Sequence, residues 1–322
     1  MIANRAWPLF DRFPALATLP RVQLREGPTP VERVESVSTN LWIKRDDLTA
    51  LPIGGNKARS LEFLLGDVVA GERVTTVGSR GSTHALSTAI HARALGAKVT
   101  IGTWPQEMNP IAEVVARELA AAANDRRAFA NAPLALSWLW WRAMRGDRAI
   151  PAGGTSPLGI LGHVNAALEL SEQVKLGLLP PPARVVVPFG TGGTAAGLAL
   201  GFGIAGMRPR IIAARVVPKI VGRKGRVVRL ARATAALIER HTGERLPQGV
   251  LGDVIVVDGV FGGAYGRPLD GAAEAANRLR ITGVALDPTY AAKAFVAALR
   301  EPFDGPTLFW LTFDARWITS GL

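Results

Sequence analysis

The stretch VVVPFGTGGTAAGLAL, residues 185–200, joins an apolar strand-like run to a helix-like run through a glycine-rich turn. The turn consists of Gly190, Thr191, Gly192, Gly193 and Thr194. Its glycines allow close backbone approach, and several backbone N–H groups at a helix start form an anion site, for which phosphate is the usual ligand. The spacing fits neither the P-loop nor the GxGxxG turn. The alternative is a tight turn without a ligand, but the two threonines add hydroxyl donors and favour a phosphate site.

The rest of the chain repeats this strand–helix rhythm. Strand-like runs lie at 41–45, 74–78, 98–102, 184–190 and 210–217. Helix-like runs lie at 58–71, 84–96, 110–122, 132–144, 156–177 and 194–206. This alternation predicts an α/β fold with twisted, parallel-type sheets and helices on both faces. The length fits about two domains, and the segment 145–157, rich in glycine, proline and charge, is the candidate boundary.

Two further segments carry candidate chemistry. The turn VGSRGSTHALS places Ser82 and Thr83 before a helix that starts near His84. Helix capping alone explains the two hydroxyls equally well, although the same donors would hold a substrate carboxylate; on spacing alone, His84 is expected to be a surface histidine. In IGGNKARSLEFLL, Lys57 follows two glycines at a helix start, where a cation is poorly placed. A lysine amine, a phosphate site and a carboxylate site together are what pyridoxal phosphate chemistry requires.

Composition restricts the alternatives. The 322 residues contain no cysteine, which excludes disulfides and thiolate ligands, and the four histidines are scattered, so no metal site is expected. The start of the chain lacks the apolar core of a signal peptide, and the longest apolar run, 194–207, is too short to span a bilayer. We therefore expect a soluble cytoplasmic protein without membrane contact.

The chain is strongly basic, with 38 − 26 = +12 formal charges. Much of the excess lies in 208–241, which reads from Val227 onward as an amphipathic helix. A solvated basic face explains this segment better than nucleic-acid binding, because it has no interleaved aromatic residues and no nucleic-acid motif. The cluster WLWW at 138–141, with Met144, fits an aromatic core, a dimer patch or a lid over the substrate; of these we favour the core.

Several motifs resemble one known family. IKRDDLTALPIGGNKARSLEFLL, GSTHALSTAIHARALGAKV, PAGGTSPLGILGHVNAALEL, FGTGGTAAGLALG, GGAYGRP and GVALDPTYAAKAFVAAL are similar to signatures of the 1-aminocyclopropane-1-carboxylate deaminase and D-cysteine desulfhydrase family. The resemblance runs from about residue 41 to the end. It implies a pyridoxal-phosphate enzyme of the tryptophan-synthase-beta type (fold type II), with a smaller domain at 58–155 and a larger one formed by 1–57 and 156–322.

The resemblance also implies roles for individual residues. Lys57 would form the Schiff base with the cofactor. The full cofactor-binding set would be Asn56, Lys57, Thr83, Gly190, Thr191, Gly192, Gly193, Thr194 and Thr282. The substrate carboxylate would meet Ser82, Thr83 and His84, and the catalytic groups would be Lys57, Ser82, Tyr265 and Tyr290. Tyr265, which would also contact substrate, and Tyr290 are the two tyrosines of the chain.

The sequence departs from the family pattern at four places. Ser60 and Thr83 stand where the family has Lys and Asn, and Thr282 stands where it has a Glu that faces the pyridine nitrogen. LTFDAR at 311–316 replaces HTGG. A threonine at the ring nitrogen would weaken the ring as an electron sink, which favours β-elimination over opening of a cyclopropane.

These observations predict a pyridoxal-phosphate lyase or deaminase, forming a homodimer, that acts on a small amino acid. Deprotonation at Cα and loss of a group from Cβ would give a keto acid and ammonia. A β-replacement enzyme and a catalytically altered homologue with a binding or regulatory role are the alternatives.

Overall fold

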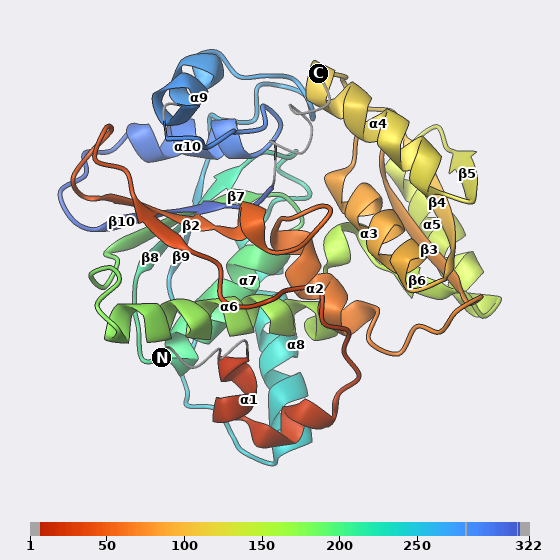
Figure 1. The fold of residues 1–322 in the computed structure, drawn as a ribbon, viewed down its shortest axis with the longest axis horizontal. Coiled ribbons are helices and arrows are strands. Elements are labelled where there is room, and N and C mark those ends of the chain that lie inside the picture. Colours follow the sequence, from red (N-terminus) through yellow and green to blue (C-terminus); the bar gives the residue numbers. More distant parts are fainter. Residues whose placement is uncertain (1–6, 281, 314, 316–322) are drawn as a thin grey trace.

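The structure, a computed structural model, describes residues 7–280, 282–313 and 315 (Figure 1). Its larger sheet has six strands in the order β1-β2-β10-β7-β8-β9. These strands are β1 (Val31–Arg33), β2 (Leu41–Arg45), β7 (Arg184–Phe189), β8 (Arg210–Arg215), β9 (Val254–Val257) and β10 (Thr307–Leu311). All pairs are parallel except β1 with β2. The chain therefore returns from its C-terminal part to insert β10 between β2 and β7.

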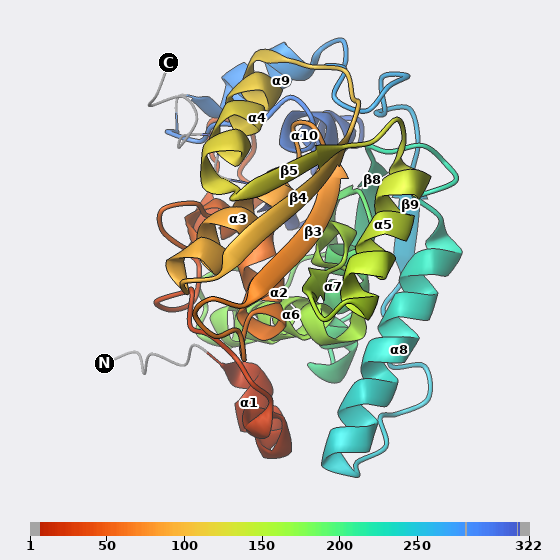
Figure 2. The same cartoon turned by 90° about the vertical axis from the view of Figure 1, so that its right-hand side faces the viewer.

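The smaller sheet has four parallel strands in the order β5-β4-β3-β6. They are β3 (Arg73–Ser79), β4 (Lys98–Trp104), β5 (Asp125–Ala128) and β6 (Arg148–Ile150). Figure 2 shows this sheet beside the helices of the larger unit. The α/β fold with helices on both sheet faces is confirmed, whereas the boundaries 58–155 stay a prediction.

Helices cover both sheets. They are α1 (Pro8–Arg12), α2 (Asn56–Leu64), α3 (Thr83–Ala94), α4 (Pro110–Ala122), α5 (Ala132–Met144), α6 (Pro157–Lys175), α7 (Gly193–Ile204), α8 (Lys224–Thr242), α9 (Ala272–Arg280) and α10 (Ala291–Leu299). Short 3₁₀ helices lie at Pro14–Thr18, Asp46–Leu48 and Ala152–Gly154. Most predicted helices are found within a few residues of their expected bounds. The exception is the helix expected over 58–71, which ends at Leu64; just beyond it, Gly66 packs directly against the backbone of Pro20.

Alternation along the central strand explains the layers of the larger unit. Val185 and Val187 enter the core formed with α1, α6, α7 and α8, whereas Val186 enters the core formed with α9 and α10. Successive strand residues point to opposite faces, so a continuous apolar strand is buried on both sides. In the smaller unit, α3 and α4 cover one face and α5 the other.

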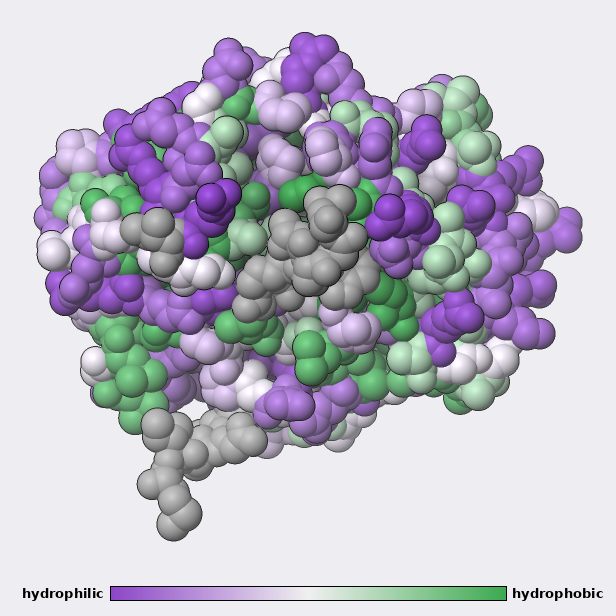
Figure 3. All heavy atoms as spheres, turned by 45° about the horizontal axis from the view of Figure 1, so that its top comes forward, coloured by the Kyte–Doolittle hydropathy of each residue, from purple (hydrophilic) through white to green (hydrophobic). Residues whose placement is uncertain are grey.

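The WLWW cluster divides between core and surface. Trp138 packs against Phe129, and Leu139 is buried, as an aromatic core requires. Trp140, Trp141 and Met144 are exposed, so the expectation of a core is wrong for them. Hydrophilic side chains cover much of the face seen in Figure 3, with apolar ones between them. No helix in the described part of the chain is long and apolar enough to cross a membrane.

Candidate active site

A cavity of about 310 Å³ lies between the two sheets, at the carboxyl ends of their strands. Turns that follow β3, β4 and β6 line it from the smaller unit, and turns that follow β7, β8 and β10 line it from the larger one. Ligands of open α/β sheets bind at this edge. Nearly all of the predicted site residues meet there: Asn56, Lys57, Ser82, Thr83, His84, Gly190, Thr191, Gly192, Gly193, Thr194, Tyr265 and Tyr290.

The two glycines before Lys57 are required by the packing of their backbone. A Cβ on Gly54 would lie 2.0 Å from the carbonyl oxygen of Asp47. Gly55 has φ = +128°, and a Cβ there would lie 2.8 Å from the carbonyl oxygen of Thr312. Thr49 closes the turn, since its Oγ1 donates to Gly55 O at 2.8 Å and accepts from Gly55 N at 2.7 Å. This tight turn fixes the start of α2 and holds Lys57 at the cavity.

Lys57 is an amine suited to covalent chemistry. Burial lowers its pKa to about 8, because removal from water disfavours the charged form. The neighbouring Asn56 donates from Nδ2 to Thr194 Oγ1 at 2.8 Å, which links the lysine segment to the glycine-rich turn. A lysine with a lowered pKa provides a neutral, nucleophilic amine near neutral pH.

The glycine-rich turn leads from β7 into α7. Gly192, at φ = +93°, caps the helix in the left-handed region. Thr191 is held from two sides: its Oγ1 lies 2.5 Å from Thr155 Oγ1, and its carbonyl accepts from Arg226 Nε at 2.9 Å. A Cβ built on Gly190 would meet only Tyr290 Cε1, at 4.0 Å, so this glycine faces open cavity. The turn thus presents a helix N-terminus and an open cradle to an anion.

The second turn uses Ser82 as a true helix cap, since its Oγ accepts from Ala85 N at 3.2 Å. Thr83 and His84 begin α3. His84 is buried and lines the cavity, and its Nε2 lies 3.1 Å from Thr76 Oγ1. Burial and the nearby Lys57 lower the pKa of His84 to about 3. His84 is therefore a neutral hydrogen-bonding group here and supplies no positive charge to a carboxylate.

The two tyrosines stand together at the cavity, with ring centroids 5.8 Å apart at an interplanar angle of 74°. Burial raises the pKa of Tyr290, and a hydrogen bond with Thr83 acts in the opposite direction. Tyr265 lies in a loop that contacts the smaller unit, since its carbonyl oxygen accepts a hydrogen bond from Glu107 N at 3.2 Å. Asn109 Nδ2 donates to the carbonyl of the next residue, Gly266, at 2.8 Å.

Thr282 requires a correction. It is exposed, it does not line the cavity, and its Oγ1 donates to Leu279 O at 2.6 Å. The hydroxyl closes the turn after α9 and does not line the cavity. The expectation that Thr282 weakens the electron sink therefore loses its structural basis.

The other departures lie at or near the site. Thr312 and Phe313, from the unusual LTFDAR segment, line the cavity, while Asp314 and Arg316 lie outside the described residues. Ser60 Oγ lies 3.1 Å from His163 Nε2 behind the glycine-rich turn. Sequence reasoning missed other lining residues, among them Trp104, Pro105, Ala132, Val217, Pro218 and Val221, which carry no reactive group.

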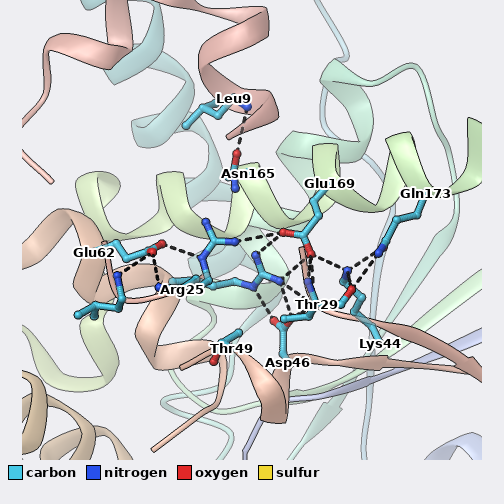
Figure 4. Close-up of polar contacts among 12 residues, drawn as sticks. Leu9, Arg25, Thr29, Lys44, Asp46, Thr49, Glu62, Asn165, Glu169 and Gln173 are labelled. Carbon is cyan, nitrogen blue, oxygen red and sulfur yellow. Dashed lines mark hydrogen bonds and ion pairs between the residues drawn. The ribbon is translucent and has the colours of Figure 1, made fainter. Parts of the chain in front are cut away.

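A buried ionic network supports the lysine helix from behind (Figure 4). Glu169 accepts from Arg59, Arg25 and Lys44, with its shortest contact, to Lys44 Nζ, at 2.6 Å. Asp46 accepts from Arg59 Nη2 at 2.6 Å and from Trp310 Nε1 at 2.7 Å. The KRDD motif thus works as a framework that ties β2, α2, α6 and β10 together. In the part of the chain that the structure describes, no group of three potential ligand side chains could hold a metal ion.

Three features define the class of site. They are a lysine with a lowered pKa, an open space beside a glycine-rich turn at one helix start, and a hydroxyl-bearing turn at another helix start. The residues fit pyridoxal phosphate, because the space beside Gly190 is open and Lys57 lies in the same cavity. Such a site belongs to enzymes that hold this cofactor on a lysine.

The comparisons with known proteins agree. Residues 22–311 match the family described as pyridoxal-phosphate dependent enzyme, and the chain belongs to this family. It is 35% identical to nocardicin C-9' epimerase of Nocardia uniformis subsp. tsuyamanensis, over 94% of each chain. It is 32% identical to D-cysteine desulfhydrase of Salmonella newport (strain SL254), over 91% of this chain and 94% of the relative. The crystal structure of an ACC deaminase homologue superposes with a TM-score of 0.78 at 29% identity, covering 94% of each chain.

Proposed function

We propose that the protein is a pyridoxal-phosphate-dependent lyase or deaminase that removes ammonia from a small amino acid bearing a leaving group on Cβ. The observation that carries the proposal is the meeting of Lys57, the glycine-rich turn and the Ser82 turn in one cavity. The similarity to D-cysteine desulfhydrases supports the reaction class.

Each group has a distinct task in this proposal. The bound cofactor supplies an electron sink for charge that develops at Cα. Gly190–Thr194 bind its phosphate, with Asn56 holding Thr194, and Ser82 and Thr83 bind the substrate carboxylate at the start of α3. Lys57 Nζ, neutral above pH about 8, takes the proton from Cα. Tyr265 and Tyr290 exclude water from one side, and the Tyr290 hydroxyl stays protonated because burial raises its pKa.

The test uses purified holoprotein and a panel of D- and L-amino acids that differ in their Cβ substituent. We expect a visible absorbance band from the lysine-bound cofactor, a shift of that band with substrate, and release of a keto acid with ammonia. A band that shifts without any product would favour the catalytically altered homologue. Product formation only with an added nucleophile would favour β-replacement.

Inversion at Cα is a second candidate, supported by the similarity to nocardicin C-9' epimerase. Besides Lys57, the cavity holds hydroxyl groups on Ser82, Tyr265 and Tyr290 that can return a proton to Cα. Exchange of the Cα hydrogen in deuterated water, with loss of optical rotation and no keto acid, would distinguish inversion from elimination.

We further propose a homodimer that uses the outer face of α5. Its exposed large apolar side chains are Leu134, Leu136, Trp140, Trp141 and Met144. An apolar stripe with two exposed tryptophans is typical of an interface. Light scattering should give twice the chain mass for the parent and for Leu176→Glu, an exposed apolar control, but the chain mass for Trp140→Glu. The cytoplasmic location and the lack of a nucleic-acid partner stay predictions.

A further inference from the structure

The residues that line the cavity become more apolar from one edge of the smaller sheet to the other. At the β6 side, Gly153 packs against Thr191 of the glycine-rich turn, so this side is the phosphate end. The next strand, β3, leads to the Ser82 turn. The next two, β4 and β5, lead to Trp104, Pro105 and Ala132, which also line the cavity. From the phosphate end, the cavity is therefore lined first by the Ser82 turn and then by apolar side chains.

The larger unit adds apolar residues to the same cavity. Val217, Pro218 and Val221 come from the segment after β8. Together with Trp104, Pro105 and Ala132 they form what we call the apolar wall. Val217 is buried, Trp104, Ala132 and Val221 are half-buried, and the two prolines are exposed, so the wall runs from the interior to the surface. Next to Val221, Ile220 is 73% exposed and extends the apolar character at the rim.

The wall has no group suited to a small polar leaving group. Among the described residues that line the cavity there is no carboxylate and no arginine, and the amine of Lys57 stands with the cofactor residues. A charged or strongly hydrated substituent would lose its water against these side chains without a partner. An alkyl or aryl substituent would instead gain by leaving water. A mainly apolar pocket with a few polar groups that fix orientation is the usual form of a selective small-molecule site.

Resting on the proposed function, but extending its substrate beyond a small amino acid, we infer that the substrate class is β-substituted alanines whose Cβ carries an apolar alkyl or aryl thioether. Lys57 Nζ takes the Cα proton, the Cβ–S bond breaks with its electron pair on sulfur, and the proton held on Lys57 Nζ passes to that sulfur, so that a neutral thiol leaves along the apolar wall. One water is consumed, and the products are a thiol, a keto acid and ammonia. The reaction needs no oxidant or reductant.

The first experiment measures binding without turnover. Calorimetric titration of the holoprotein with alanine and phenylalanine, each as D- and L-form, compares substituents that cannot be eliminated. We expect phenylalanine of the preferred enantiomer to bind at least about tenfold more tightly than alanine, equivalent to about 1.4 kcal/mol. Equal affinities, or tighter binding of alanine, would overturn the inference.

A pair of variants localises the effect. Ala132→Glu places a carboxylate on the apolar wall at the first turn of α5, where an acid is compatible with the helix. It should abolish the preference for phenylalanine, whereas Ser137→Glu, exposed on the same helix and outside the cavity, should retain it. A preference that survives in Ala132→Glu would place the side chain elsewhere and refute the assignment.

Turnover measurements distinguish a failure of this inference from a failure of the proposed function. With S-benzylcysteine and cysteine as paired substrates, we expect kcat/KM to favour the benzyl compound at least tenfold. A protein that holds the cofactor and eliminates from cysteine as fast as, or faster than, from S-benzylcysteine would overturn the inference and leave the proposed function intact. A protein with no lysine-bound cofactor and no elimination from either compound would refute both.

Discussion

Gly190→Ala should weaken binding of the cofactor without lowering the stability of the fold. The added Cβ would meet no atom of the chain closer than Tyr290 Cε1 at 4.0 Å, and the backbone of Gly190 is not in the positive-φ region. The unfolded chain loses conformational freedom, so the free energy of unfolding of the apoprotein should stay level or rise by about 0.4–1 kcal/mol. The methyl group nevertheless occupies the open cradle at the phosphate end.

The cost should therefore appear only in cofactor binding. Forcing one extra carbon into a filled site costs about 1–3 kcal/mol, so the Kd for pyridoxal phosphate should rise about 5- to 150-fold. Absorbance titration of the apoprotein measures the Kd, and urea unfolding measures the stability. Gly225→Ala, whose Cβ meets open space in α8, is the control and should leave the Kd unchanged. Parental affinity in Gly190→Ala, with unchanged stability, would show that the phosphate does not lie against Gly190.

Three further changes test other parts of the site. The rate at which Lys57 couples to added cofactor should rise with pH with a midpoint at about pH 8 and level off at higher pH, because the neutral amine is the reactive form; a midpoint near 10.5 would contradict the lowered pKa of Lys57. Glu169→Gln should lower the free energy of unfolding by about 3–5 kcal/mol in a urea titration, because the buried Lys44 amine then has no carboxylate partner, whereas Glu172→Gln, from an exposed pair with Lys175, should cost under about 1 kcal/mol. Thr282→Glu should leave the absorbance spectrum and kcat/KM of the holoprotein unchanged; a new long-wavelength band would return Thr282 to the site.

Local signals in the sequence predicted α3 to α7 within a few residues, but no prediction covered α9 or α10. Pro110 and Pro133 stand in the first turns of α4 and α5, and asparagine caps precede both, so their bounds are encoded within a few residues. Strand order is not encoded in this way. β10 pairs in parallel with β2, more than 260 residues earlier, and only packing of the whole chain selects that neighbour.

The reactive part of the site was predictable because its chemistry demands particular residue types at turns between strands and helices. Lys57 and the glycine-rich turn belong to that set, and the structure brings both to one cavity. The apolar wall was not predictable, because residues such as Trp104 and Val221 look like any core residue until the turns converge. Thr282 failed for the opposite reason: its position in a motif suggested a role, but its hydroxyl bonds to its own turn.

The departure at Ser60 makes sense only together with its neighbours. Ser60 Oγ lies 3.1 Å from His163 Nε2, which lies 3.5 Å from Thr194 Oγ1 in the glycine-rich turn. Burial and the nearby Lys57 lower the pKa of His163 to about 3, so its ring is neutral at physiological pH. The family resemblance suggests a lysine cation behind the phosphate. This protein instead has a row of neutral side chains linked by hydrogen bonds, which ends at Asn56. A second full cation beside Lys57 would lower the pKa of its amine further. In place of that cation, Ser60 and His163 hold the glycine-rich turn by hydrogen bonds that reach Thr194. The backbone N–H groups at the start of α7 are then the main partners for an anion.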